Sequence, residues 1–436
     1  MKQAIRELAR KALAGNMPML ILRGGDEQDC AGGDIDILVP SGESIRACQL
    51  IVEQAKQAGW YLAGFKDIGY VASIILLRPG ANGCDDAIKL DLISGLEWYA
   101  MGDGSATNKF FELLNCYVNE QERVAGLVAF ATFIQKIMAS GQLSTRDRSR
   151  VRKGAPHNEL LLVTADFIGM PLLANDMDEK GIQRGRQWKL RAASAGVSGP
   201  IRFALWLPRV VLAHLRFKLG IGNHAGCVIG LSGLDGSGKS TQMDRLFAAF
   251  RKAGYARPRL VHLLPEWIPM PHQLLRRKKT IQNYTMPYAE AAVKSKWNGL
   301  LRLTYYLMAF TVAKWWLGLN ALRGRVIVLD RSFVDFAADL TRARIPDFQL
   351  PPWLIRLCVP KGALLYLDAS PGTVVRRKGE LTLEKATQLR GRYLVVFQQI
   401  DGAVVDAEGP PEIVFRRVLE CIDSVYVGRL KAAARA

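Results

Sequence analysis

Residues 230–241 read GLSGLDGSGKST and satisfy the pattern G-x-x-x-x-G-K-[ST]. The motif itself, residues 233–240, follows the apolar run 228–231 and precedes a helical pattern over 242–254, which is the context that a phosphate-binding loop needs. In such a loop the backbone N–H groups surround phosphates, the lysine reaches the outer phosphates and the hydroxyl ligates Mg²⁺. The segment therefore predicts a site for a nucleoside triphosphate and Mg²⁺, which by itself is compatible with a kinase, a GTPase, a motor or a regulatory ATPase. Its members are Gly233, Asp235, Gly236, Ser237, Gly238, Lys239, Ser240 and Thr241.

Two later segments carry residues that suit phosphoryl transfer. The β-branched run VIVLDRSFVD (326–335) ends in Asp330 and Arg331, and the run ALLYLD (363–368) ends in an aspartate. Side chains at the carboxyl ends of strands lie where α/β proteins bind ligands. Asp330 could hold the metal or accept a proton, and Arg331 could grip an acceptor phosphate or another anion.

A basic segment follows, RRKGELTLEKATQLRGRY (376–393). By itself, such a run is typical of a solvated helix face. Because it follows the last core strand of a fold that contains a phosphate-binding loop, it resembles instead a mobile lid that brings cations to the transferred phosphoryl group. Its candidate catalytic residues are Arg376, Arg377 and Arg390, with Arg392 beside them.

The first half of the chain holds a different set of acids, in LRGGDEQDCAGGDIDILVP (22–40). Asp34 and Asp36 are two residues apart in an apolar strand, so both carboxylates project from one face. Two like charges this close require a cation, and carboxylates are the usual ligands of Mg²⁺. Asp91, in the predicted strand IKLDLIS, could complete the metal site.

The order of patterns predicts an α/β protein of several parts. A strand, a turn and a second strand are expected over 19–39, a helix over 44–58, strands at 70–77 and 88–93, and helices from 110 onward. From 226 strands and helices alternate, as a parallel sheet with crossover helices requires. The expected divisions are an α+β domain (1–110), a helical extension (111–200), a basic connector (201–225) and a three-layer α/β/α domain (226–436).

The net charge of the chain indicates which kinds of partner it could bind. The net charge of +19 lies mostly in residues 226–436, which hold 32 Lys+Arg against 17 Asp+Glu. Such a field favours anionic partners, and without aromatic-interleaved basic repeats we do not expect nucleic acid.

Seven scattered cysteines argue against disulfides or zinc, and the N-terminus lacks the apolar stretch of a signal peptide, so we expect a cytoplasmic protein. Peripheral contact with an anionic membrane and a homodimer both stay open.

The set GLDGSGKST, VIVLDRS, LLYLDASP and the arginine-rich segment resembles the thymidylate kinase-like family of P-loop kinases, over residues 226–425. The resemblance implies that Lys239, Ser240 and Thr241 bind ATP phosphates and Mg²⁺, that Asp330 and Arg331 lie near the acceptor, and that the lid supplies arginines. The family's Arg-Glu-Pro motif is absent, since LVHLLPEW (260–267) holds Pro and Glu in reverse order. The acceptor is therefore a nucleoside monophosphate, dTMP among the candidates, or a small sugar or anionic molecule.

Residues 20–93 resemble the polymerase β-like nucleotidyltransferases. That resemblance implies that Gly24 and Gly25 hold an incoming triphosphate and that Asp34, Asp36 and Asp91 hold two metal ions. Three functions thus stay open: a kinase in the second half, a nucleotidyltransferase in the first, and a non-enzymatic ATP-binding scaffold at a membrane surface.

The apolar stretch 300–322 precedes the Asp-Arg strand. Its charges at Arg302 and Lys314 indicate a buried helix more than a membrane span, and we expect its aromatic residues to pack in the core.

Overall fold

A computed structural model provides the fold, and two separate stretches of the chain each build a sheet. The described residues are 2–23, 34–67, 71–80, 85–94, 105–116, 208, 212, 227–253, 258–269, 296–322, 325–343, 345–346, 348–400 and 402–435. The helical extension and the basic connector expected between the two halves lie almost entirely outside these residues.

The first sheet is mixed, with the strand order β1-β2-β5-β4-β3. Strands β2 and β5 are parallel and the other neighbours are antiparallel. Helices α1 and α2 pack on one another, and α2 also contacts β3, β4 and β5. The elements are α1 (Lys2–Leu13), β1 (Leu20–Arg23), β2 (Asp34–Leu38), α2 (Ser44–Gln57), β3 (Tyr61–Asp67), β4 (Val71–Arg78), β5 (Asp86–Ile93) and α3 (Ser105–Cys116).

Most of these elements follow from the apolar patterns, but β3 was not predicted. Its sequence YLAGFKD carries a glycine and ends in two charged residues, so it lacks a strong strand signal. The strand forms because β4 offers it a long apolar edge, and the register shifts between Leu62 and Gly64. A Cβ on Gly64 would lie 2.7 Å from Ile75 Cδ1, so glycine allows this close pairing.

The second sheet has five strands in the order β10-β9-β6-β8-β7, and every neighbouring pair is parallel. The prediction of an α/β protein with a parallel sheet is therefore confirmed. The elements are β6 (Cys227–Ser232), α10 (Lys239–Lys252), β7 (Arg259–His262), α12 (Lys296–Leu322), β8 (Val326–Asp330), α13 (Phe333–Ala338), the 3₁₀ helix η4 (Leu340–Ala343), α14 (Pro352–Cys358), β9 (Ala363–Asp368), α15 (Pro371–Lys378), α16 (Leu383–Gln398), β10 (Ala403–Asp406) and α17 (Pro411–Ala433).

Alternate residues of the central strands contact different apolar clusters. Val228 and Ile327 pack with Leu317 and Ala321 of α12, whereas Ile229 belongs to the large core that also contains α10. The strand order reverses at β6, which lies between β8 and β9. Ligands of open parallel sheets bind at such a switch point, outside the carboxyl ends of the strands.

The long helix α12 only partly meets the expectation that its aromatic residues are buried. Tyr306 and Phe310 pack on Phe336, with ring centroids 4.8 and 5.5 Å from it. Trp315 is instead 73% exposed. The expectation is wrong for this tryptophan, because only one side of the helix contacts the sheet and its neighbours.

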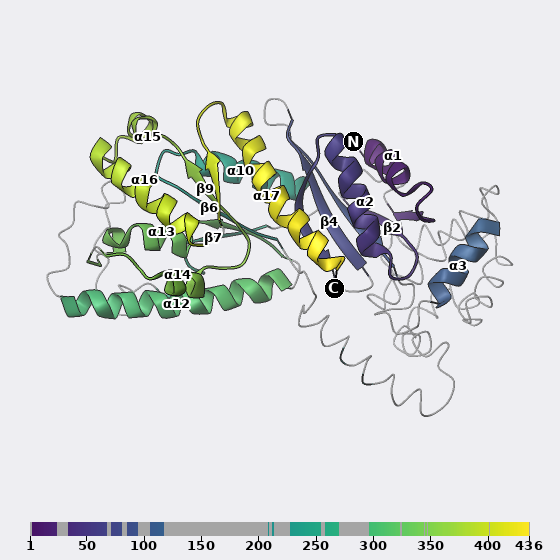
Figure 1. Ribbon diagram of the computed structural model, residues 1–436, viewed down its shortest axis with the longest axis horizontal. Coiled ribbons are helices and arrows are strands. Elements are labelled where there is room, and N and C mark those ends of the chain that lie inside the picture. The colour runs from purple at the N-terminus through teal and green to yellow at the C-terminus, as the bar shows by residue number, and fades with distance from the viewer. Residues whose placement is uncertain are drawn as a thin grey trace.

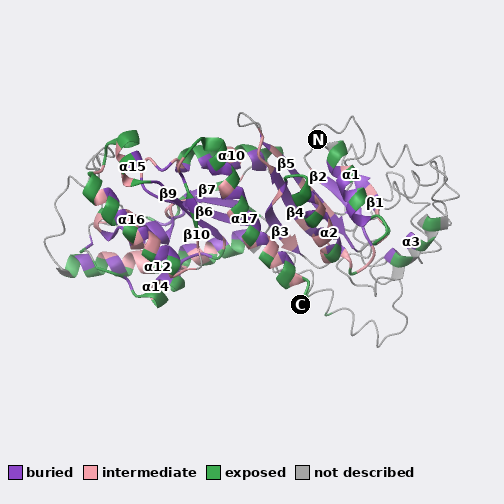
Figure 2. Cartoon of the chain, turned by 45° about the horizontal axis from the view of Figure 1, so that its top comes forward, coloured by how far each residue is buried: buried purple, intermediate pink, exposed green. Residues whose placement is uncertain are grey.

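Helix α17 joins the two sheets. It lies between them in Figure 1 and contacts β3 of the first sheet and β9 and β10 of the second. Its Asp423 accepts a hydrogen bond from the Leu62 backbone N–H at 2.8 Å and forms an ion pair with Lys56 at 2.7 Å. One apolar core continues through both sheets, and buried residues run from one to the other in Figure 2. The two halves are thus packed as one body.

A buried ion pair also crosses this junction. Arg245 of α10 donates two hydrogen bonds to Asp85, at 3.0 and 2.6 Å, and the two side chains are only 11% and 5% exposed. The guanidinium also stacks over Phe415 of α17, 4.2 Å from the ring centroid. The helix that begins in the phosphate-binding loop is therefore fixed to the first half of the chain.

We predict that Asp85→Ala lowers the free energy of unfolding by about 3 kcal/mol or more, because it leaves the buried Arg245 charge unpaired. The neighbouring variant Asp86→Ala removes the partly exposed pair with Arg78 and should cost less than about 1 kcal/mol. Urea unfolding of the two variants measures both effects. Equal losses would show that the junction does not depend on this pair.

Candidate active site

The phosphate-binding loop connects the end of β6 to the start of α10. Gly236 and Gly238 adopt left-handed backbone conformations, with φ of 99° and 92°. A Cβ on Gly236 would also lie 3.1 Å from the Val374 carbonyl oxygen. Glycine is required here because other residues rarely adopt this conformation and the loop approaches α15 closely. The sequence pattern thus specifies a real turn that aims the N-terminus of α10 into the cavity.

Lys239, the first residue of α10, points back into the loop. Its Nζ donates to the carbonyl oxygens of Gly233 and Leu234, at 2.7 and 2.9 Å, and the residue is 7% exposed. Burial, followed by the charge of Arg331, lowers the pKa of Lys239 to about 8. Within the described ranges, only carbonyl oxygens lie within hydrogen-bond distance of this cation, and the carboxylate of Asp235 is 3.8 Å away, so a phosphate oxygen would be a favourable partner.

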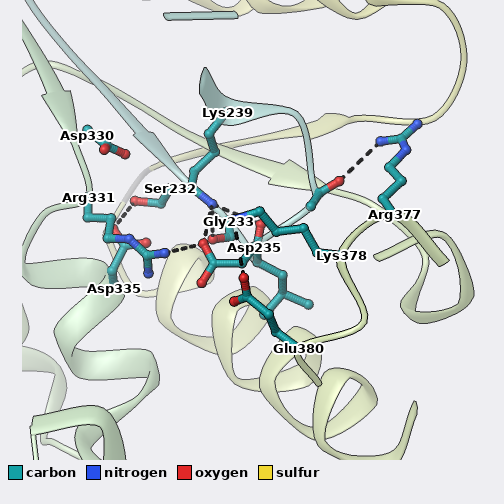
Figure 3. Close-up of polar contacts among 12 residues, drawn as sticks. Ser232, Gly233, Asp235, Lys239, Asp330, Arg331, Asp335, Arg377, Lys378 and Glu380 are labelled. Carbon is teal, nitrogen blue, oxygen red and sulfur yellow. Dashed lines mark hydrogen bonds and ion pairs between the residues drawn. The ribbon is translucent and has the colours of Figure 1, made fainter. Parts of the chain in front are cut away.

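Asp330 and Arg331 lie beside the loop because β6 and β8 run in parallel register. Leu231 pairs with Asp330, and the Arg331 N–H donates to the Leu231 carbonyl. Arg331 has φ 68°, an uncommon conformation for a residue other than glycine, and such strain concentrates at functional sites. The turn directs the guanidinium toward the loop, as Figure 3 shows.

The Asp330 carboxylate has a histidine partner. His262, at the end of β7, lies with Nδ1 2.8 Å from Asp330 Oδ2. Burial raises the pKa of Asp330, but the hydrogen bond and charge of His262, with Lys239 and Arg331, outweigh burial and hold it below its usual value. Asp330 is thus ionised at neutral pH and suited to hold a cation or accept a proton.

Asp235 of the loop collects three cations. It forms ion pairs with Arg331 and with Arg342 of η4, the latter at 3.2 Å, and lies 3.8 Å from Lys239 Nζ. Burial raises the pKa of Asp235, but Arg331, Lys239 and Arg342 together outweigh it and bring the pKa below its usual value. The loop carboxylate therefore fixes the arginines near the phosphate-binding residues.

A buried hydrogen-bond network around Asp335 holds together the elements that carry the loop and Arg331. Asp335 accepts from the Ser232 hydroxyl at 2.6 Å, from the Ser332 N–H at 2.8 Å and from the Tyr393 hydroxyl at 2.9 Å. Ser332 and Asp335 also form the capping box of α13. One carboxylate thus ties the end of β6 to α13 and to α16.

These elements enclose a cavity of about 640 Å³, which suits a small-molecule ligand. The loop lines one side, and the other lining residues that bear charge or a ring nitrogen are His262, Asp330, Arg331, Arg342, Arg377 and Lys378. A smaller hollow lies on the other side of Asp235, between η4 and α16, and is lined by Asp335, Asp339, Leu381, Leu389 and Tyr393. Ser240 and Asp330 both line the larger cavity, and a hydroxyl with a carboxylate is a donor set that fits Mg²⁺.

The arginines predicted for the lid are placed differently from one another. Arg377, near the end of α15, donates to the Gly236 carbonyl at 3.3 Å and lines the cavity (Figure 3). Arg376 lies within 3.5 Å of Thr373 Oγ1, and Arg390 pairs with both oxygens of Asp368, at 2.7 and 2.8 Å. Arg392 is half-buried on α16. The structure brings only Arg377 of these four to the loop.

The acids of the first sheet do come together. Parallel pairing places Asp36 opposite Asp91, and the ligand oxygens of Asp34, Asp36 and Asp91 lie within 4.8 Å of one another. Asp91 forms an ion pair with Lys89 through one oxygen, while its buried Oδ1 has no hydrogen-bond partner among the described residues. Three oxygens, one of them buried without a partner, fit a divalent cation. Gly24 and Gly25 lie outside the described residues.

No protein-family model matches the chain, and no curated protein sequence matches it. Among solved structures, the chain is similar to a deoxyadenosine kinase from M. mycoides with the products dCMP and a flexible dCDP bound, at 16% identity, covering 45% of this chain and 99% of that one with a TM-score of 0.29. The same enzyme with bound dATP gives 16% identity, 44% and 97% coverage and a TM-score of 0.28.

Sequence reasoning missed several cavity residues. His262 and Arg342 lie in segments without a recognised motif, and only the β7–β8 pairing and the position of η4 bring them to Asp330 and Asp235. Asp335 did carry a signal, since Ser332 and Asp335 have the S-x-x-D spacing of a helix N-terminus.

We predict that Arg377→Ala weakens binding of a fluorescent ATP analogue by about tenfold, because a charged hydrogen-bond donor leaves the cavity. Arg376→Ala, its neighbour on α15, should leave the dissociation constant unchanged. Titration by fluorescence anisotropy compares them directly. A larger loss for Arg376→Ala would contradict the observed orientation of the two side chains.

Proposed function

We propose that the chain is an ATP-dependent phosphotransferase of the thymidylate kinase-like P-loop type, which transfers the γ-phosphate of ATP to a small acceptor. The observation that carries the proposal is the shared cavity, in which Lys239 of the loop, Asp330 and Arg331 converge. A regulatory nucleotide site needs only the loop. An ionised carboxylate and fixed arginines beyond the loop are what phosphoryl transfer requires in addition.

Each residue has a role in this scheme. Lys239 and the loop N–H groups bind the β- and γ-phosphates, and Arg377 stabilises the negative charge on the transferred group. Where the acceptor group is a hydroxyl, Asp330 accepts its proton, with His262 orienting the carboxylate, whereas an acceptor phosphate reacts through an oxygen that is already deprotonated. Mg²⁺ bound by Ser240, with Asp330 beside it, would neutralise phosphate charge.

The acceptor class follows from the charged residues that line the larger cavity beside the loop. The Asp330 carboxylate accepts hydrogen bonds from hydroxyl groups, and Arg331 and Arg342 bind an anion. We therefore propose a nucleoside monophosphate, with dTMP among the candidates, or a phosphorylated or anionic sugar. The proposed architecture is a cytoplasmic, three-layer P-loop kinase domain that follows a nucleotidyltransferase-like α+β domain.

The test is acceptor-dependent ADP formation across nucleosides, nucleoside monophosphates and sugar phosphates. We predict that Lys239→Ala reduces kcat/KM for the active acceptor by about a hundredfold or more, because it removes a positioned cation from the transition state. Lys431→Ala, an exposed lysine near the end of α17, is the matched control and should be unaffected. Absence of ADP with every acceptor, or full activity in Lys239→Ala, would refute the kinase.

A second activity is favoured by one specific observation, the cluster of Asp34, Asp36 and Asp91 with its unpartnered buried oxygen. We propose that these acids hold divalent metal for transfer of a nucleotide to a hydroxyl, with release of pyrophosphate. In this scheme Lys89, already paired with Asp91, lies where it could offset the charge of a bound triphosphate.

We predict that Asp91→Asn removes a Mn²⁺ site seen by titration calorimetry in the Lys239→Ala background, where the loop site is weakened. Asp86→Asn, on the same strand but outside the cluster, is the control. Pyrophosphate release from nucleoside triphosphates should disappear in Asp91→Asn and persist in Lys239→Ala. Unchanged Mn²⁺ binding in Asp91→Asn would show that the cluster holds no metal.

A further inference from the structure

Helix α12 presents an apolar stripe to solvent. Counting from Trp297, six of the seven large exposed apolar residues of the helix recur at steps of four, seven, four, three and four, which places these six on one side. The seventh, Leu300, is 53% exposed and adjoins Leu301. The stripe extends about 33 Å along the axis. Its members and their exposed fractions are Trp297 (76%), Leu301 (69%), Met308 (63%), Val312 (49%), Trp315 (73%) and Leu319 (44%).

The short helix α14 extends this surface. Lys314 of α12 donates to the carbonyl oxygens of Arg356 and Leu357 at the end of α14, at 3.0 and 2.9 Å, and so holds the two helices together. Trp353 and Leu357, one turn apart on α14, are 66% and 49% exposed. We call the stripe together with these two residues the α12–α14 face. Both helices lie at the lower edge of the molecule in Figure 1, and exposed residues follow α12 in Figure 2.

The sequence of these two helices and of the segments that flank them carries charge of one sign. Residues 291–329 contain six lysines and arginines and no acidic residue, and residues 351–367 contain Arg356 and Lys361 and no acidic residue. Arg356 and Lys361 are both exposed. Tryptophan beside lysine or arginine on an apolar face is the composition of segments that lie in the interface between lipid headgroups and acyl chains.

This charge pattern discriminates between two occupants. A second copy of the chain would bring the same patch against itself, and its cations would face cations without an acidic partner. An anionic lipid surface complements both the apolar stripe and its basic border. In the described part of the chain no helix combines the length and the apolar composition that crossing a bilayer requires.

We propose that the α12–α14 face docks on the anionic surface of a lipid bilayer, with the helix lying in the membrane plane. The tryptophans sit at headgroup level, and the basic border contacts lipid phosphates. Because α12 leads directly into the strand that ends in Asp330, docking places the proposed active site near a membrane surface.

The experiment is cosedimentation of the full-length protein with vesicles of equimolar phosphatidylglycerol and phosphatidylcholine, and with vesicles of phosphatidylcholine alone. We expect binding to the anionic vesicles that weakens as salt rises. The double variant Met308→Ser with Trp315→Ser should lower the partition coefficient by about tenfold or more, since two exposed apolar side chains lose their burial in the interface. The matched control, Val404→Ser with Ile413→Ser, removes two apolar residues that are each 45% exposed elsewhere and should bind as the wild type does.

Circular dichroism and thermal unfolding establish that the variants are folded, and Trp353→Ser on the separate helix α14 provides a second test that does not alter α12. Binding equal to the wild type in both the α12 and the α14 variants would overturn the proposal, as would no binding of the wild type at low salt. A wild-type dimer that the double variant converts to monomer, in light scattering without vesicles, would assign the face to a second copy instead. Acceptor-dependent ADP formation is measured separately in detergent-free solution, so failure of docking is distinguishable from failure of the kinase.

Discussion

Parallel pairing of the strands around β6 is the constraint on which the candidate active site depends. Because β6 and β8 run in the same direction with Leu231 opposite Asp330, the phosphate-binding loop and the Asp-Arg pair leave the sheet at the same edge. The pairing of β7 with β8 brings His262 opposite Asp330 in the same way. A shift of register by one residue would turn the Asp330 side chain to the other face of the sheet and separate the carboxylate from Lys239.

The first half of the chain packs against the helices α10 and α17 of the second half and so helps to position the phosphate-binding loop. Helix α10 begins at Lys239 and carries Arg245, which is held by the buried Asp85, the residue that precedes β5 of the first sheet. Helix α17 is shared by both sheets through Asp423 and an apolar core that continues across the junction. The arrangement explains why the phosphate-binding loop can come late in the chain: the preceding half packs against the half that holds the loop, in addition to having its own acidic cluster.

Local patterns predicted much of this. The loop, the strands β4 and β5, the alternation that forms the parallel sheet and the acids on β2 and β5 all have signals that lie within a few residues of one another. Strand β3 could not be predicted, because its sequence is a poor strand and it forms only by pairing with β4. His262 and Arg342 could not be predicted either, since no local pattern distinguishes a histidine or an arginine that reaches a cavity from one that faces solvent.

The sequence by itself determined the chemistry that is available, because phosphate binding and metal ligation depend on residue types at short, fixed spacing. Only the tertiary structure decided which of the candidate residues lie where they could bind phosphate or metal. Of the arginines in the basic segment, Arg377 reaches the loop while Arg390 is held by Asp368, since the orientations of α15 and α16 differ. Likewise α12 is apolar around most of its circumference, so composition could not say which side is covered. The elements that pack against α12 decide which side is covered, and they leave Trp297 and Trp315 exposed.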